Sequence, residues 1–293
     1  MSALHAHPDV RPAPLPPRFL RNTATVARRE LREAVHSRWF ILYTLAFAAL
    51  GLAISYVASI TAGGAGLAGF GRTTAGLINL VLLVAPLMAL TAGAGSIASD
   101  RERGMLAYLL AQPVSRTEVI LGKYLGLAAA LTACIALGLG ACAMVLASKG
   151  QAAKPASILW LAALSLILML AMLSLGMLLS ALARKASVAV GTAIFLWLTL
   201  VFVTDLGLMA GTIALKLRVE ELFALSLANP LQVFKMWSLH AVDATLDVLG
   251  PAGLYALEEH ADRLHLYFAL CMLAWIALPL TAATLIFSRR SPL

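Results

Sequence analysis

Six apolar segments dominate this sequence, and each is long enough to cross the roughly 30 Å hydrocarbon core of a bilayer. They run from Phe40 to Ile60, Thr74 to Ala98, Val119 to Ala147, Ala156 to Leu182, Ser187 to Thr204 and Leu264 to Phe287. Only 12% of the residues are charged, about half the share that is typical of soluble proteins. The sequence therefore predicts an all-α polytopic membrane protein with six transmembrane helices.

The remaining sequence predicts how these spans are organised. We expect residues 1–18, which hold five prolines and no apolar core, to be a disordered tail rather than a secretory signal. Residues 39–290 then form a single transmembrane domain, with no room for a soluble enzyme as well. Its outer segment, residues 205–263, contains only short apolar stretches and a helix-start signal at Asn229-Pro230, so short helices on the outer surface are expected.

Basic residues predict the orientation of the chain. With both termini cytoplasmic, 15 Lys and Arg residues fall on the inner side and 7 on the outer side, as the positive-inside rule requires. We therefore expect a multi-pass protein of the cytoplasmic (inner) membrane. The net charge of +8 would suggest nucleic-acid binding in a soluble chain, but here the charge marks the inner face, and no nucleic-acid partner is expected.

A charged passage, "SDRERGMLAYLLAQPVSRTEVILGKYLG" (residues 99–126), separates the second and third apolar segments. Ser99 stands three residues before Glu102, and Ser115 three before Glu118, so each pair matches the capping box of a helix start. The first helix is expected from Asp100 to Gln112, ending at Pro113. The alternative is an ordinary charged connector, which would need neither caps nor an apolar face. That expected face consists of Met105, Leu106, Leu109 and Leu110.

The approach to the first span, "FLRNTATVARRELREAVHSRWF" (residues 19–40), has the pattern of an amphipathic helix. An apolar stripe lies on one side and several arginines lie elsewhere, so residues 19–38 are expected to form an interfacial helix in the headgroup plane. Trp39 occupies the place of an aromatic anchor. The stripe consists of Leu20, Ala24, Ala27, Leu31 and Val35.

Taken in order, these features resemble the permease subunits of ABC-2 type transporters. "VARRELREAVHSRWF" is similar to the family's entrance helix, and the charged passage is similar to its signature loop. "NPLQVFKMWSL" (residues 229–239) resembles a segment of the NosY branch, whose permeases serve nitrous-oxide-reductase maturation. The resemblance implies an all-α fold that works with a separate cytoplasmic ATPase.

The resemblance also implies roles for particular residues and partners. The loop helix would be the coupling helix, which docks on the ATPase, and Arg184-Lys185 would be either a minor contact or a positive-inside anchor. A second permease copy, most simply in a homodimer, and an outer-compartment partner are further implications. The ATPase-coupling residues would be Asp100, Arg101, Glu102, Arg103, Gly104, Met105, Leu106, Leu109, Leu110, Gln112 and Pro113.

Other classes of protein fit the sequence less well. No GxxxxGK[ST] motif is present, so the chain is not expected to hydrolyse ATP itself. A secondary transporter or channel usually places ionisable groups deep in its spans, whereas Lys123 and His265 lie near span ends and Asp205 is expected to cap the fifth span. No residues suggest an intramembrane enzyme, and no catalytic, cofactor or metal site is expected. Copper binding by Met236 and His240 would need a third ligand.

Overall fold

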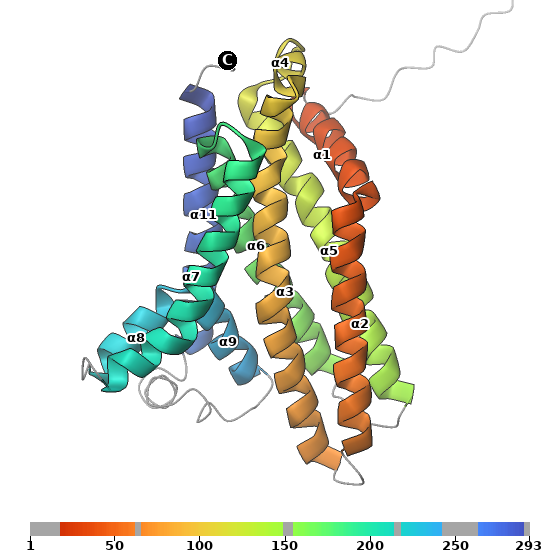
Figure 1. Cartoon of the computed structure of the whole chain (residues 1–293), viewed down its shortest axis with the longest axis vertical. Helices are drawn as coiled ribbons and strands as arrows, with labels where there is room; N and C mark the ends of the chain where they lie inside the picture. The colour runs from red at the N-terminus through yellow and green to blue at the C-terminus, as the bar shows by residue number, and fades with distance from the viewer. Residues whose placement is uncertain (1–17, 62–65, 149–154, 214–217, 242–262, 290–293) are drawn as a thin grey trace, which may run out of the picture.

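The computed structural model describes residues 18–61, 66–148, 155–213, 218–241 and 263–289, which are almost entirely helical (Figure 1). Residues 1–17 of the predicted tail lie outside the described residues. No strand occurs in the described ranges. The helices are α1 (Arg18–His36), α2 (Arg38–Thr61), α3 (Gly66–Glu102), α4 (Met105–Leu110), α5 (Arg116–Ser148), α6 (Pro155–Leu182), α7 (Ala186–Ile213), α8 (Val219–Leu227), α9 (Pro230–Ala241) and α11 (Leu264–Arg289).

Five helices are long and apolar enough to cross a membrane, which confirms a polytopic membrane fold. They contain the first, second, third, fourth and sixth predicted spans, and the helices exceed most of those spans at one or both ends. The fifth predicted span lies in α7, whose described side chains form a shorter apolar helix, Ala186–Phe202. The count of six transmembrane helices therefore stays a prediction.

Helix α6 lies at the centre of the bundle and packs most extensively against α3. Glycines allow this contact, because a Cβ atom on Gly176 would come within 2.3 Å of the Leu90 carbonyl oxygen. A Cβ atom on Gly93 would likewise meet the Leu173 carbonyl oxygen at 2.7 Å. Small residues let helices in a membrane approach closely enough for backbone packing, and α3 and α6 form such a pair. Gly95 borders open space and takes no part in it.

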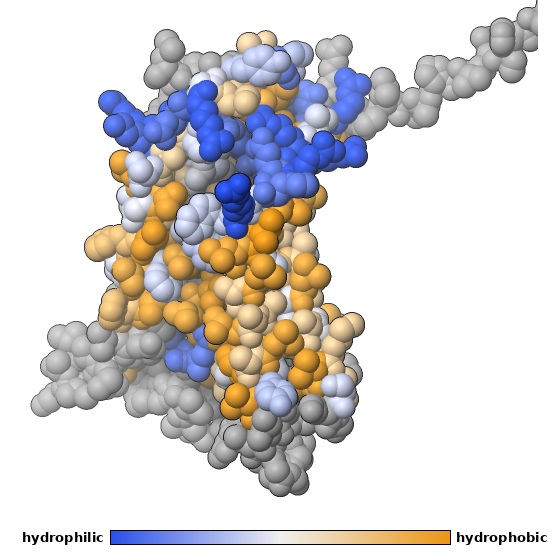
Figure 2. Space-filling model, turned by 45° about the vertical axis from the view of Figure 1, so that its right-hand side comes forward, coloured by the Kyte–Doolittle hydropathy of each residue, from blue (hydrophilic) through white to orange (hydrophobic). Residues whose placement is uncertain are grey.

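The surface around the bundle is apolar, as lipid contact requires. Large side chains such as Met144, Phe195 and Leu278 are mostly exposed. In Figure 2 this belt is orange, and hydrophilic residues gather at the end of the molecule that carries α1 and α4. This polar end is the one that the sequence assigns to the cytoplasm.

At the opposite end, two sequence expectations are wrong. Helix α7 continues to Ile213, so Asp205 lies within the helix instead of capping its end, because no strong helix breaker follows Thr204. Helix α9 is not a surface helix, since most of its side chains are buried against α6 and α11. Even its polar residues Gln232 and Ser238 are buried, so the packing of the bundle and not the apolar pattern of the helix sets its position. Residues 242–262 of the predicted outer segment lie outside the described residues.

The predicted start of α9 is confirmed. Pro230 is its first residue, and the Asn229 side-chain oxygen accepts a hydrogen bond from the Leu231 N–H at 3.0 Å. The Asn229 amide group also donates to the Leu200 carbonyl oxygen at 2.8 Å. Asn229 therefore caps α9 and joins it to α7.

Candidate functional site

The charged passage lies at the polar end of the bundle, where α3 ends and α4 follows (Figure 1). Helix α3 runs through Asp100, Arg101 and Glu102 before the chain turns at Gly104, whose φ of 73° is in the left-handed region. Glycine commonly ends helices in this way because it has no Cβ atom to clash. The predicted single helix from Asp100 to Gln112 is therefore wrong, since its first turn belongs to α3 and only Met105–Leu110 form α4.

The two predicted capping boxes have different outcomes. The pair Ser115 and Glu118 is confirmed, because the Ser115 N–H donates to the Glu118 carboxylate at 2.6 Å and the Glu118 N–H donates to the Ser115 hydroxyl at 3.2 Å. The pair Ser99 and Glu102 is wrong. Ser99 lies inside α3, and its hydroxyl donates to the Gly95 carbonyl oxygen. A serine within a continuing helix bonds backward along that helix and caps nothing.

Helix α4 presents one apolar face to the bundle and another to solvent. Leu106 is 2% exposed and Leu109 is 8% exposed, so both belong to the core of this chain. Met105 is 38% exposed and Tyr108 is 66% exposed. Among the described side chains of α4, Met105 and Tyr108 are therefore the apolar ones open to a partner, while the side chain of Leu110 lies outside the described residues. Tyr108 was absent from the sequence-based set, although its i, i+3 spacing from Met105 places both on one helix face.

The end of α3 is joined to the short turn between α6 and α7. The Arg101 guanidinium donates a hydrogen bond to the Ala183 carbonyl oxygen. The Glu102 carboxylate accepts one from the Ala186 N–H at 3.2 Å, at the start of α7. Arg184 and Lys185, in this same turn, are exposed. Arg101 and Glu102 thus link the loop of α4 to the second inner turn.

A buried charged cluster lies just behind this loop. Lys123 of α5 is 1% exposed, and its Nζ atom is 2.8 Å from a carboxylate oxygen of Glu30 and 2.7 Å from one of Asp100. Burial raises the pKa of Glu30 above its usual value, and the attraction of Lys123 opposes that rise. The cluster joins α1, α3 and α5. Asp100 is therefore part of the interior instead of a free docking residue.

Helix α1 packs closely along the first turns of α5. A Cβ atom on Gly126 would come within 2.5 Å of the Ala27 carbonyl oxygen, and one on Gly122 within 2.6 Å of Val26. The Asn22 amide group also donates to the carbonyl oxygen of Pro113, at 3.3 Å. The loop that contains α4 is thus held from the N-terminal side as well.

The predicted apolar stripe of α1 makes this contact with α5 only in part, through Ala27 and Leu31. The buried side of the helix carries Thr23, Val26, Glu30 and Ala34. Within the predicted stripe, Leu20, Ala24 and Val35 are exposed and Ala27 and Leu31 are half-buried. The helix therefore has two apolar sides, one against α5 and one open to the surroundings.

At the other end of the bundle, two histidines come together. The rings of His240 on α9 and His265 on α11 have centroids 4.6 Å apart, and the Trp237 indole N–H lies 3.0 Å from the Nδ1 atom of His265. Met236 is fully buried in α9. Within the described residues, no group of three His, Cys, Asp or Glu side chains is placed to hold a metal ion.

Comparisons with known proteins agree with this architecture. Residues 24–291 match the model of a family described as ABC-2 family transporter protein. The chain is 30% identical over 272 residues to the probable ABC transporter permease protein NosY of Stutzerimonas stutzeri, covering 90% of this chain and 97% of that protein. It is also 30% identical to the protein of the same name from Pseudomonas aeruginosa, covering 91% of this chain and 98% of that protein.

The match extends from α1 to the end of α11, so it includes the loop of α4 and the buried cluster behind it. The two relatives are permease proteins and match over nearly their whole length. The chain belongs to the ABC-2 family of transporter proteins, as a membrane-embedded permease subunit of an ABC transporter.

Proposed function

We propose that this permease subunit converts ATP hydrolysis by a separate cytoplasmic ATPase into movement of its transmembrane helices, and that α4 is the element that docks on the ATPase. The observation that carries the proposal is the arrangement of α4 itself. Met105 and Tyr108 are exposed, while Leu106 and Leu109 anchor the same short helix in the bundle. Exposed tyrosines on a rigid base are typical of the few residues that dominate protein interfaces.

The contacts behind α4 support transmission of a force from this helix. Arg101 and Glu102 bind the turn before α7, and Lys123 joins the end of α3 to α1 and α5. A displacement of α4 would therefore be felt by several spans at once. Helix interfaces that switch between two discrete packing arrangements transmit such displacements. The close contact of α3 with α6 is the interface proposed to switch in this way.

The wider assembly is proposed on the same basis. The chain would act as a homodimer with two ATPase chains in the cytoplasmic membrane, with both termini in the cytoplasm. The names of the two relatives, read with the resemblance of residues 229–239 to the NosY branch, favour a role in an outer-side maturation step of a copper enzyme such as nitrous oxide reductase, or in export for it. An outer-compartment partner would receive the movement at the end that carries α8 and α9.

The coupling proposal is tested with the purified chain, its ATPase and the two together in proteoliposomes. The chain alone should hydrolyse no ATP above the rate of an empty-vesicle control. Adding the chain should change the rate of the ATPase and bring the ATPase to the vesicles. An ATPase that neither binds the vesicles nor changes its rate would contradict the coupling role.

The proposed orientation can be tested by cysteine labelling in intact cells. A cysteine in place of exposed Glu220 on α8 should react with a membrane-impermeant maleimide from outside, because this residue lies at the predicted outer end. A cysteine in place of exposed Arg184 should react only after the membrane is opened. The native cysteines, of which Cys134 and Cys142 are buried, are replaced first to remove background. The reverse pattern of labelling would invert the topology.

A secondary transporter is a second candidate, and one observation favours it. Lys123 and its two carboxylate partners are buried ionisable groups, which in transporters often carry protons. The cluster lies in the third turn of α5, however, and one of its members belongs to α1, outside the spans. Transport that continues without the ATPase and depends on a proton gradient would favour this alternative.

A further inference from the structure

Helix α1 carries a line of exposed arginines on the side that faces away from α5. Arg21, Arg28 and Arg32, here called the basic ridge, lie within about 40° of one another around the helix axis because an α-helix turns by 100° per residue. All three side chains are exposed. Within the described part of the chain, none of their guanidinium groups has a carboxylate at ion-pair distance.

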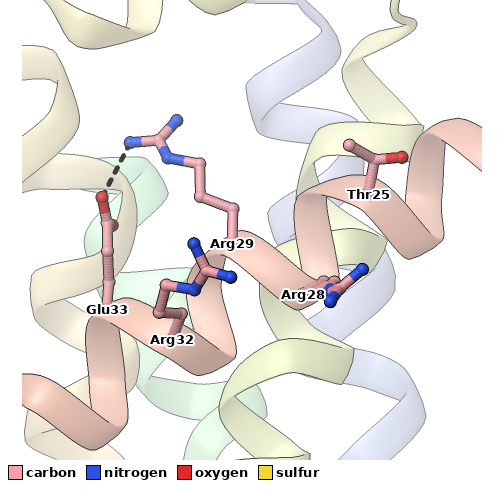
Figure 3. Close-up of a pocket in the computed structure, with 5 residues that line it drawn as sticks. All are labelled: Thr25, Arg28, Arg29, Arg32 and Glu33. Carbon is pink, nitrogen blue, oxygen red and sulfur yellow. Dashed lines mark hydrogen bonds and ion pairs between the residues drawn. The ribbon is translucent and has the colours of Figure 1, made fainter.

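The neighbouring Arg29 differs from the ridge. Its guanidinium is 3.1 Å from the Glu33 carboxylate, so its charge is already paired. In Figure 3 a dashed line joins Arg29 to Glu33, whereas Arg28 and Arg32 carry no such line. The five residues drawn there border a hollow of about 440 Å³ along α1. Arg28 and Arg32 stand four residues apart, where two like charges repel each other unless an anion lies between them.

The position of α1 beside the start of the α5 span indicates that the ridge lies near the membrane surface. Close packing at Gly122 and Gly126 fixes α1 beside the first three turns of α5, within roughly 15 Å of the start of that span. Between the ridge and the buried side lie exposed Leu20, Ala24 and Val35, here called the apolar flank. In Figure 2 hydrophilic residues at this end directly border the apolar belt.

We propose that the basic ridge of α1 is a binding site for the headgroup of an anionic phospholipid. The apolar flank would contact the acyl chains, while the guanidinium groups of Arg28 and Arg32 bind the phosphate oxygens through paired N–H donors. Arg21 would add long-range attraction to the negative charge of the inner leaflet. A zwitterionic lipid carries its own cation and fits this site less well. The proposal does not depend on the ATPase.

The experiment measures lipid binding to the full chain purified in detergent, by native mass spectrometry. The chain is titrated separately with phosphatidylglycerol and with phosphatidylcholine that have identical acyl chains. The dissociation constant of the first bound lipid molecule is measured for each. The wild-type chain should bind phosphatidylglycerol at least about tenfold more tightly than phosphatidylcholine, since each arginine near an anionic surface contributes roughly a fivefold preference. The combined variant Arg21→Gln, Arg28→Gln and Arg32→Gln should bind the two lipids equally.

The matched control is the combined variant Arg103→Gln, Arg184→Gln and Lys185→Gln, because it removes the same number of exposed cations at the same end of the molecule but outside α1. This variant should keep the preference for phosphatidylglycerol, and all variants should melt at the wild-type temperature. Equal binding of both lipids by the wild type, or a preference that survives in the combined variant, would overturn the proposal. Displacement of phosphatidylglycerol by millimolar inorganic phosphate would overturn it too, since the site would then bind free anions. A combined variant that keeps its lipid preference but loses the ATPase would assign the ridge to a protein contact instead.

Discussion

Replacing Lys123 with methionine is expected to lower the stability of the chain by roughly 3–5 kcal/mol. The reason is electrostatic, because Lys123 is the cation that pairs with both Glu30 and Asp100, and its loss leaves two carboxylates buried without a partner. Methionine has a similar length and keeps the packing of the stem. For a chain of this size the midpoint of thermal unfolding should fall by about 10 °C.

The measurement is the melting temperature of the detergent-purified chain, followed by size-exclusion chromatography of heated samples. Lys185→Met is the matched control, since Lys185 is an exposed lysine at the same end of the molecule. A second variant, Lys123→Met with Glu30→Gln and Asp100→Asn, should recover most of the loss because no unpaired charge remains in the cluster. A melting temperature of Lys123→Met close to that of Lys185→Met would show that the cluster contributes little.

The buried cluster also shows what sequence patterns cannot predict. The sequence places Lys123 near a span end, and in the structure it lies in the first turns of α5. Its partners Glu30 and Asp100, however, lie on other helices and are separated from it by 93 and 23 residues. No local pattern connects residues so far apart. Only the packing of α1 and α3 around α5 brings the three charges together.

Local signals were reliable where local chemistry decides the structure. Five of the six apolar segments, the Ser115–Glu118 capping box and the Asn229-Pro230 helix start each depend on residues that are close in sequence, and these are confirmed. The Ser99–Glu102 pair has the same Ser-x-x-Glu pattern but lies in the last turns of a long helix. Because α3 continues through this pair, Ser99 has no helix N-terminus to cap. The capping pattern alone is therefore misleading here.

The faces of α4 were assigned wrongly for a related reason. The spacing of Met105, Leu106, Leu109 and Leu110 predicts one apolar face, but it does not predict whether that face packs on the chain's own core or on a partner. The helix begins only after Gly104, and its short length allows Leu106 and Leu109 to turn inward. Gly104 after a charged turn was itself a signal of a helix end. The described apolar side chains of α4 that a partner can reach are therefore the exposed ones, Met105 and Tyr108.

This reassignment decides which variant tests the docking of the ATPase. Leu109→Asp would place a charge in the core of the permease, so a lost complex would say nothing about the docking surface. Tyr108→Ala combined with Met105→Ala changes only exposed side chains. Loss of an interface tyrosine of this kind costs about 2–4 kcal/mol, so the affinity for the ATPase should fall by at least about thirtyfold.

The assay is co-purification of the ATPase with the tagged chain over a range of ATPase concentrations, with membrane insertion checked for every variant. Tyr56→Ala is the matched control, because Tyr56 is an exposed tyrosine on α2, towards the other end of the molecule. The control should recover the ATPase fully while the α4 variant recovers little. Full recovery with the α4 variant would make α4 an ordinary connector. The links from Arg101, Glu102 and Lys123 to the neighbouring helices would then serve stability alone, because no force would enter the bundle at α4.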